Sequence, residues 1–124
     1  MEPPAATAGS NESGLSLWHG DGISVLALSG PVDRELAGRA DAALQRLLVA
    51  HDGAVAIDVS TVAAVNGSVL GVLLRASRRL AWRNRRLYVV CGQPDACTRL
   101  RIAGIDELAM LVDAVPAGDS VRRP

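Results

Sequence analysis

The sequence predicts an α/β fold, with one domain built on a mainly parallel sheet of four to five strands and three to four helices. Two observations support this prediction. Segments with apolar residues at helical spacing alternate with short apolar runs that are typical of buried strands. The 124 residues, 49% of them apolar, are enough for one core and leave little room for a second domain.

The first half of the chain predicts a hairpin followed by a helix. Leu15 and Leu17 alternate with polar neighbours, which is typical of an edge strand, and a Gly-Asp-Gly turn joins it to a second strand at 23–28. Residues 34–50 repeat apolar side chains at helical spacing, and the carboxylate of Asp33 can cap that helix.

The second half alternates strands with helices. The apolar run at 54–59 predicts a central buried strand, and 68–83 predicts a helix with one apolar face. A strand at 86–91, a short helix at 95–103 and a last strand at 108–112 complete the order. Strands separated by helices imply right-handed crossovers and a mainly parallel sheet, with the first strand pairing at an edge.

Both ends of the chain lack periodicity. Residues 1–13 predict a disordered arm and 114–124 a flexible tail around a domain at 14–113, because both ends are rich in small residues and Pro. We expect a cytoplasmic protein with no membrane insertion, since no secretory signal and no apolar stretch of about 20 residues occurs. Acidic and basic residues number 13 each, which argues against nucleic acid as a partner.

Few residues indicate catalysis. His19 and His51 have no Ser or Cys nucleophile near them in the sequence, and neither a phosphate-binding glycine loop nor metal-ligand spacing occurs. We therefore predict no enzyme, no cofactor and no metal site. A buried pair of Asp33 and Asp58 is the catalytic alternative that stays open.

Two other features have ordinary structural interpretations. We expect Cys91 and Cys97 to be reduced core thiols, with a redox switch as the alternative. Six arginines between 75 and 86 form a basic run, which we interpret as a solvated helix face, with a surface for an acidic partner as the alternative.

The junction between the central strand and the helix at 68–83 is the most informative segment. Asn66 and Ser68 are both good helix caps, Gly67 permits a tight turn, and Gly71 lets another group approach the helix closely. On these residues alone, 66–71 is either a plain strand-to-helix cap or a working surface that another group approaches.

This junction resembles the same segment of the STAS family, whose best-known members are bacterial anti-sigma factor antagonists. Those proteins typically read D-L-S-x-V-x-x-I-D-S-S-G-L-G-x-L-L, and residues 58–74 read D-V-S-T-V-A-A-V-N-G-S-V-L-G-V-L-L. Three more segments are similar in the same order: L-S-G-P-V-D at 28–33, R-L-Y-V-V at 86–90 and L-R-I-A-G-I-D-E-L at 100–108. The resemblance covers about 15–113 and implies a STAS-like fold.

The resemblance also implies a function. Such an antagonist binds an anti-sigma factor of the serine-kinase type and so frees a sigma factor. The kinase phosphorylates a Ser or Thr at the helix start, and the added charge separates the partners. The partner-binding residues that it implies here are Asp33, Asn66, Gly67, Ser68, Val69 and Gly71.

The chain departs from the family at the phosphorylation site. Asn66 replaces the usual Asp, Gly67 occupies the acceptor position, Ser68 keeps the second Ser, and Val69 replaces the next Gly. Either Ser68 is the candidate phosphorylation site, displaced by one residue, or the phospho-switch is lost. We favour the second, because one residue along a helix rotates the side chain by about 100°.

Two other functions stay open. STAS domains also occur as small cytoplasmic subunits of lipid-transport ABC complexes, where they brace the ATPase. A sensor could instead bind a small molecule or nucleotide at the helix start. The family's usual last helix is expected to be short or absent after Val115-Pro116, which would leave an apolar groove for a partner or for a second copy in a homodimer.

Overall fold

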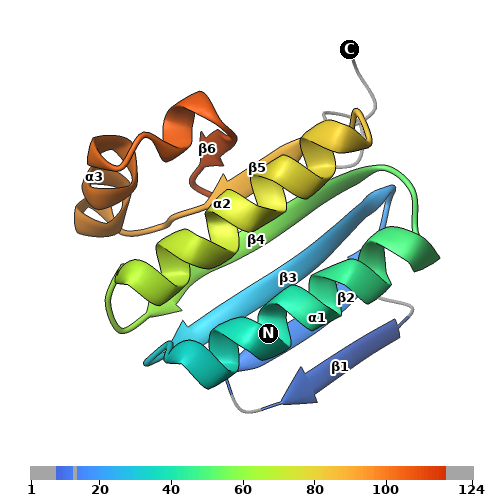
Figure 1. Ribbon diagram of the computed structural model, residues 1–124, viewed down its shortest axis with the longest axis horizontal. Helices are drawn as coiled ribbons and strands as arrows, with labels where there is room; N and C mark the ends of the chain where they lie inside the picture. Colours follow the sequence, from blue (N-terminus) through green and yellow to red (C-terminus); the bar gives the residue numbers. More distant parts are fainter. Residues whose placement is uncertain (1–7, 13, 117–124) are drawn as a thin grey trace.

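One mixed sheet forms the centre of the computed structural model, which describes residues 8–12 and 14–116 (Figure 1). Its strands follow the order β1-β2-β3-β4-β5-β6. They are β1 (Ala8–Glu12), β2 (Leu15–Gly20), β3 (Ile23–Gly30), β4 (Ala54–Val62), β5 (Leu87–Val90) and β6 (Met110–Val112). The helices are α1 (Arg34–Ala50), α2 (Gly67–Trp82), α3 (Pro94–Ile102) and the 3-10 helix η1 (Ile105–Glu107).

The sheet is antiparallel at one edge and parallel elsewhere. β1, β2 and β3 pair antiparallel, whereas β3, β4, β5 and β6 pair parallel. Each parallel step needs a crossover, and α1, α2 and α3 supply the three of them. The predicted α/β class and mainly parallel sheet are therefore confirmed.

The strand count exceeds the predicted four to five because of β1. Residues 8–12 were predicted to lie in a disordered arm, yet they pair with β2, from Ala8 opposite His19 to Glu12 opposite Leu15. The segment A-G-S-N-E has no apolar alternation, so this edge strand is held by backbone hydrogen bonds that a side-chain pattern does not reveal. The rest of the arm, and the tail beyond residue 116, lie outside the described residues.

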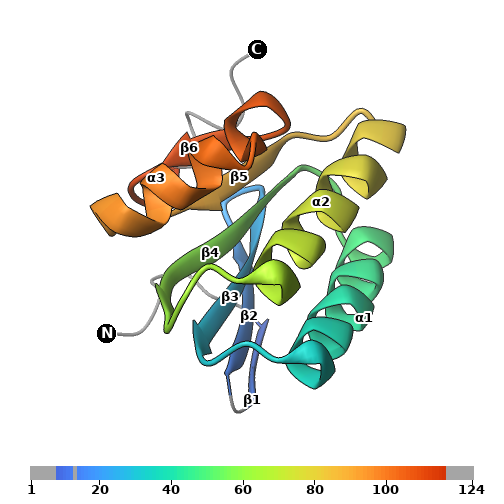
Figure 2. The same cartoon turned by 60° about the vertical axis from the view of Figure 1, so that its left-hand side comes forward.

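Helices α1 and α2 lie side by side on one face of the sheet (Figures 1 and 2). The main core lies between these two helices and the sheet, and its buried side chains include Leu26, Leu44, Ile57 and Leu73. Arg75 of α2 forms an ion pair with Asp41 of α1, with 2.7 Å between Nε and Oδ2. Because α1 follows β3 and α2 follows the parallel strand β4, both helices begin at the same end of the sheet.

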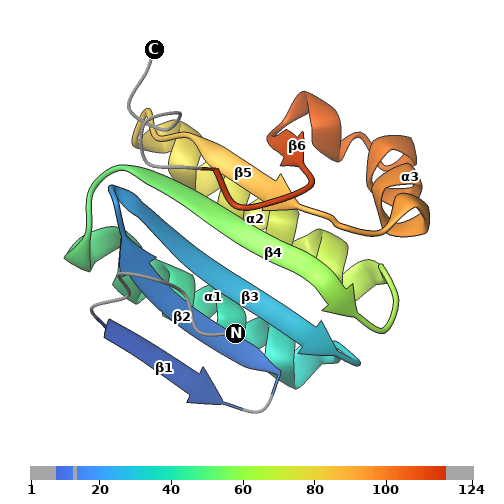
Figure 3. The same ribbon diagram turned by 180° about the vertical axis from the view of Figure 1, so that it is seen from behind.

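The opposite face of the sheet has no described helix across it (Figure 3). A second buried cluster lies on this face, with Trp18, Val112 and Val115 packed against it. The register places Trp18, Val25, Ala56 and Tyr88 in one row, so that two aromatic residues flank two small ones. Val25 and Ala56 have 0% exposure. Residues 113–116 form no helix, and the apolar groove that we expected beside a missing last helix stays a prediction.

The predicted helix at 34–50 is confirmed residue for residue as α1. Its cap is also confirmed, because Oδ1 of Asp33 accepts a hydrogen bond from the backbone N–H of Leu36 at 2.8 Å. α2 begins at Gly67, one residue before the predicted start, and β4 runs to Val62 rather than to residue 59. No described helix is both long enough and apolar enough to span a membrane.

Candidate functional site

The candidate surface lies at the carboxyl ends of β3 and β4, where α1 and α2 begin. The two strand-to-helix loops are bonded together there. The N–H of Ala63 donates to the carbonyl of Gly30 at 2.8 Å, and Nδ2 of Asn66 donates to the carbonyl of Val32 at 2.9 Å. In sheets of this type, binding sites are usually found at this edge.

Asn66 makes two different side-chain bonds. Its Oδ1 accepts a hydrogen bond from the N–H of Val69 at 3.0 Å, which caps α2, and its Nδ2 donates to Val32. An aspartate could make the first bond but has no donor for the second. The amide at the position where the family usually has Asp therefore both caps α2 and ties its start to the loop before α1.

The first two residues of α2 are accessible from solvent. Gly67 is exposed, and a Cβ atom added there would meet no atom within 4 Å. Ser68 is half-buried, and its hydroxyl makes no hydrogen bond with any described residue. α2 has no acidic residue in its first turn. Its N-terminal backbone N–H groups therefore form a locally electropositive surface.

Two of the predicted partner-binding residues have close neighbours within the chain itself. Val69 has 0% exposure and packs in the main core, so its assignment to the surface is wrong. Gly71 does admit a close approach, but by Arg75 of the same helix, whose Nη1 would lie 3.1 Å from an added Cβ. Of the predicted set, Asp33, Asn66 and Gly67 are exposed, and Ser68 and Gly71 are half-buried.

The buried acid pair that we kept as a catalytic alternative is not formed. Asp33 is exposed and caps α1, whereas Oδ1 of Asp58 accepts a hydrogen bond from the N–H of Ser60 at 2.9 Å. Within the described residues, no group of three or more His, Cys, Asp or Glu could hold a metal ion.

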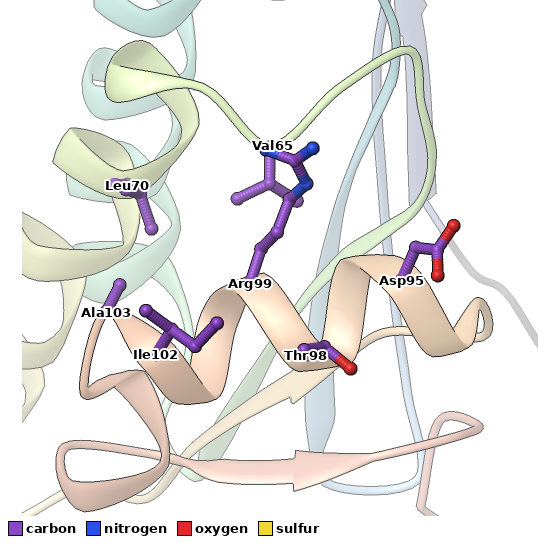
Figure 4. Close-up of a pocket in the computed structure, with 7 residues that line it drawn as sticks. All are labelled: Val65, Leu70, Asp95, Thr98, Arg99, Ile102 and Ala103. Carbon is purple, nitrogen blue, oxygen red and sulfur yellow. The ribbon is translucent and has the colours of Figure 1, made fainter.

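A groove of about 680 Å³ lies beside the start of α2 (Figure 4). Val65 and Leu70 form one wall, and α3 forms the other. The α3 side is lined by Asp95, Thr98, Arg99, Ile102 and Ala103. Arg99 projects from α3 toward Val65, and Ile102 is 82% exposed. The sequence does not predict this groove, because its walls come from segments about 30 residues apart. The apolar Ile102 at the end of a largely polar helix is the one signal that could have indicated it.

The two cysteines are not the reduced core thiols that we expected. Cys91 and Cys97 form a disulfide, with 5.6 Å between their Cα atoms, rather than two reduced thiols. The bond connects the residue after β5 to α3, and so reaches the helix that forms one wall of the groove.

The two histidines lie at the other end of the sheet from the candidate surface. Their rings stack with 3.8 Å between centroids, and Nδ1 of His19 lies 3.0 Å from the hydroxyl oxygen of Ser24. Burial lowers the pKa of His19, and the neighbouring His51 lowers it further. They contribute nothing to the edge where α2 begins.

The basic run also has a structural explanation in part. Arg75 and Arg79 of α2 both contact Asp41 on α1. Nε of Arg85 donates to the carbonyl of Gly53 at 2.7 Å, and its Nη1 donates to that of Leu48 at 3.1 Å. Arg75 and Arg79 thus link α2 to the middle of α1, and Arg85 links to the end of α1 and the turn after it.

The chain matches one protein-family model and is similar to solved structures. A family model with the description "Mlab, STAS domain" matches residues 18–113. A crystal structure of an anti-sigma factor antagonist from Mycobacterium paratuberculosis is similar, with a TM-score of 0.74 and 21% identity over 99% of this chain and 100% of that one. No curated protein matches the chain.

Two structures of SpoIIAA are similar as well. The anti-sigma factor antagonist SpoIIAA in its unphosphorylated form has a TM-score of 0.66 and 15% identity, over 79% of this chain and 87% of that one. The Bacillus cell fate determinant SpoIIAA in the phosphorylated form has a TM-score of 0.63 and 15% identity, over 79% and 90%. At these identities the likeness shows a shared fold.

Proposed function

Because the chain belongs to the STAS domain family, we propose that it is a regulatory protein-binding module of the anti-sigma factor antagonist type. One observation carries this proposal: the exposed start of α2 lies directly beside a groove with one apolar wall and one mixed polar and apolar wall, at the carboxyl edge of the sheet, where open α/β sheets usually bind ligands. The fold shared with solved antagonists over nearly the whole chain supports it.

The partner that we propose is an anti-sigma factor of the serine-kinase type. By sequestering it in the cytoplasm, the chain would free a sigma factor, without catalysing a reaction itself. The N–H groups at the start of α2 are suited to an acidic or carbonyl oxygen of the partner. Leu70 and Ile102 are suited to an apolar side chain, and the guanidinium of Arg99 to a carboxylate at the rim.

We further propose that this binding is constitutive with respect to phosphorylation, because the usual phospho-switch is lost. The usual acceptor position is Gly67, which has no hydroxyl to phosphorylate. Ser68 is the remaining candidate, but it is half-buried and lies one residue further around the helix. A chain of this kind would release its partner in response to something other than phosphorylation of residue 67.

The test is a binding measurement with Ser68→Asp against the anti-sigma factor encoded nearest to the gene. A carboxylate at the start of α2 is expected to leave the free chain as stable as before or up to about 1 kcal/mol more stable, because it opposes the positive end of the helix dipole. The same charge inside a protein interface costs several kcal/mol unless it is paired, so affinity should fall by about tenfold or more.

The matched control is Asn84→Asp, which adds the same charge just beyond the other end of α2. Asn84 is exposed and has a φ of 53°, which Asp tolerates nearly as well. This variant should bind like the wild-type chain. Unchanged affinity of Ser68→Asp would remove Ser68 from the interface, and failure of the wild-type chain to bind any anti-sigma factor would overturn the proposal.

The second candidate is a STAS subunit that braces the ATPase of a lipid-transport ABC complex. The lack of a helix over residues 113–116 agrees with the short C-terminal end that such subunits tend to have. Co-purification from the native cell separates the two candidates, because it would recover an ABC ATPase in one case and an anti-sigma factor in the other. Size-exclusion chromatography with light scattering tests the homodimer.

A further inference from the structure

A short covalent link joins the sheet to the outer helix of the candidate groove. Cys91 directly follows β5 and has 2% exposure, whereas Cys97 lies in α3 and is half-buried. Only six positions separate them, so the bond closes a very small loop. A small loop constrains its own neighbourhood far more than it constrains the unfolded chain. The bond therefore acts on α3.

Helix α3 has few other attachments to the domain. Of its nine residues only Leu100 is buried, and Gln93 provides no side-chain cap for its first turn. Near its start, the N–H of Gly92 donates to Oγ of Ser60 at 3.0 Å, and Nε2 of Gln93 donates to the Ser60 carbonyl at 3.1 Å. The disulfide adds a covalent restraint to the first half of the helix, where Ala96 and Cys97 also pack against the main core.

The position of α3 determines the shape of the groove. Asp95, Thr98, Arg99 and Ile102 follow one another at helical spacing and form one wall, opposite Val65 and Leu70 (Figure 4). Cys97 lies on the other side of the helix, where it packs against the main core. The disulfide thus holds the inner side of α3, while the outer side faces the place where a partner would bind.

We propose that the Cys91–Cys97 disulfide is a redox-sensitive clamp that holds α3 in place and keeps the groove in its binding form. Disulfides inside cells are commonly transient and sense the redox state. The reductant is a dithiol, either a small one or a dithiol protein. The effect on partner affinity rests on the proposed function, whereas the effect on α3 does not.

The reaction is a thiol–disulfide exchange. A thiolate of the dithiol attacks Sγ of Cys97, the more accessible sulfur; the S–S bond breaks, and Cys91 leaves as a thiolate that takes up a proton. The second thiolate of the dithiol then displaces Cys97, which is also protonated. The protein gains two electrons and two protons, and the dithiol becomes a disulfide.

The first experiment compares the full chain before and after treatment with dithiothreitol, so it needs no variant. Alkylation and mass spectrometry count the free thiols, and hydrogen exchange follows the amides of α3, with those of α1 as the internal reference. The oxidised chain should show no free thiol. Reduction should speed exchange in α3 by about tenfold or more and leave α1 unchanged.

The second experiment measures affinity for the anti-sigma factor encoded nearest to the gene. Reduction should weaken binding by about tenfold, because only part of the reduced population would keep α3 in the binding position. Cys97→Ser should behave like the reduced chain and should not respond to dithiothreitol. The matched control is Val49→Ser, a change to Ser at an 81% exposed position of α1 outside the groove, which keeps both cysteines and should respond like the wild-type chain.

Three results would overturn the clamp. They are two free thiols in a chain equilibrated with oxidised glutathione, equal hydrogen exchange of α3 in both redox states, and equal affinity in both states. If the anti-sigma factor binds neither form, the proposed function fails, while the exchange of α3 still decides whether the disulfide holds the helix.

Discussion

Two substitutions of Asn66 distinguish the contributions of the two hydrogen bonds that fix the start of α2. Its Oδ1 caps the helix through the N–H of Val69, and its Nδ2 ties the helix start to the carbonyl of Val32 in the loop before α1. Asn66→Ala removes both bonds. Asn66→Asp keeps the cap and removes the donor, because both oxygens of a carboxylate only accept hydrogen bonds.

The expected costs follow from these two bonds. Loss of an N-cap to Ala costs about 1 kcal/mol, and loss of the hydrogen bond to Val32 costs about 1 kcal/mol more. Asn66→Ala should therefore lower the free energy of unfolding by about 2 kcal/mol. Asn66→Asp should lower it by only about 0.5–1 kcal/mol, since the charge gains about 0.3–1 kcal/mol at the helix start but faces the Val32 carbonyl.

Urea unfolding of the wild-type chain, Asn66→Asp and Asn66→Ala measures their free energies of unfolding. The comparison is valid if the slope m is the same for all three chains. Thermal midpoints provide a second measure, because 1 kcal/mol shifts the midpoint of a domain of this size by about 4 °C. Asn84→Asp is the control for an amide-to-acid change near α2 and should stay within about 0.5 kcal/mol of wild type. Equal stability of Asn66→Asp and wild type would refute the tie to Val32, and equal stability of Asn66→Asp and Asn66→Ala would refute the cap.

Three other predictions concern single positions. Gly67→Ser should fold normally, because its Cβ enters open space, and should become a substrate of a serine-kinase anti-sigma factor; a chain that mass spectrometry shows to be unmodified at 67 would contradict this. Gly71→Ala should change stability by between zero and a gain of about 1 kcal/mol, since the helix favours Ala and the flexible end of Arg75 can move, and a clear loss in urea unfolding would contradict it. Burial and His51 lower the pKa of His19 below 6.5, so the unfolded chain binds more protons and the urea midpoint should fall as pH drops from 6.5 through the folded pKa. His19→Gln should flatten that dependence.

Local patterns in the sequence determined most of the fold. The helix at 34–50 was predicted with its cap because its apolar spacing and Asp33 act within a few residues of each other. β1 could not be predicted in this way. Its five small or polar residues become a strand only because the outer edge of β2 offers unpaired backbone groups, and that edge exists only after the hairpin has formed.

The candidate site was predictable only in part for a similar reason. Its position at 66–68 follows from cap chemistry and family motifs, both of which are local. Whether Val69 faces the partner or the core depends on where the sheet lies relative to α2, and the structure places it in the core. The groove and the disulfide each require α3 to return beside another element, which spacing along the chain does not determine.

The electrostatics of the two neighbouring helix starts support the proposal of constitutive binding. α1 carries Asp33 at its cap and Glu35 in its first turn, so acidic groups of the chain itself already oppose its positive end. α2 has the neutral Asn66 at its cap and no acid in its first turn. A negative group supplied by a partner is therefore favoured at α2 and disfavoured at α1. An Asp at 66 would supply part of that charge from within the chain, and a phosphate at 67 would supply more of it. The amide at 66 and the missing hydroxyl at Gly67 thus act in the same direction, since both leave the start of α2 open to a partner's acidic group.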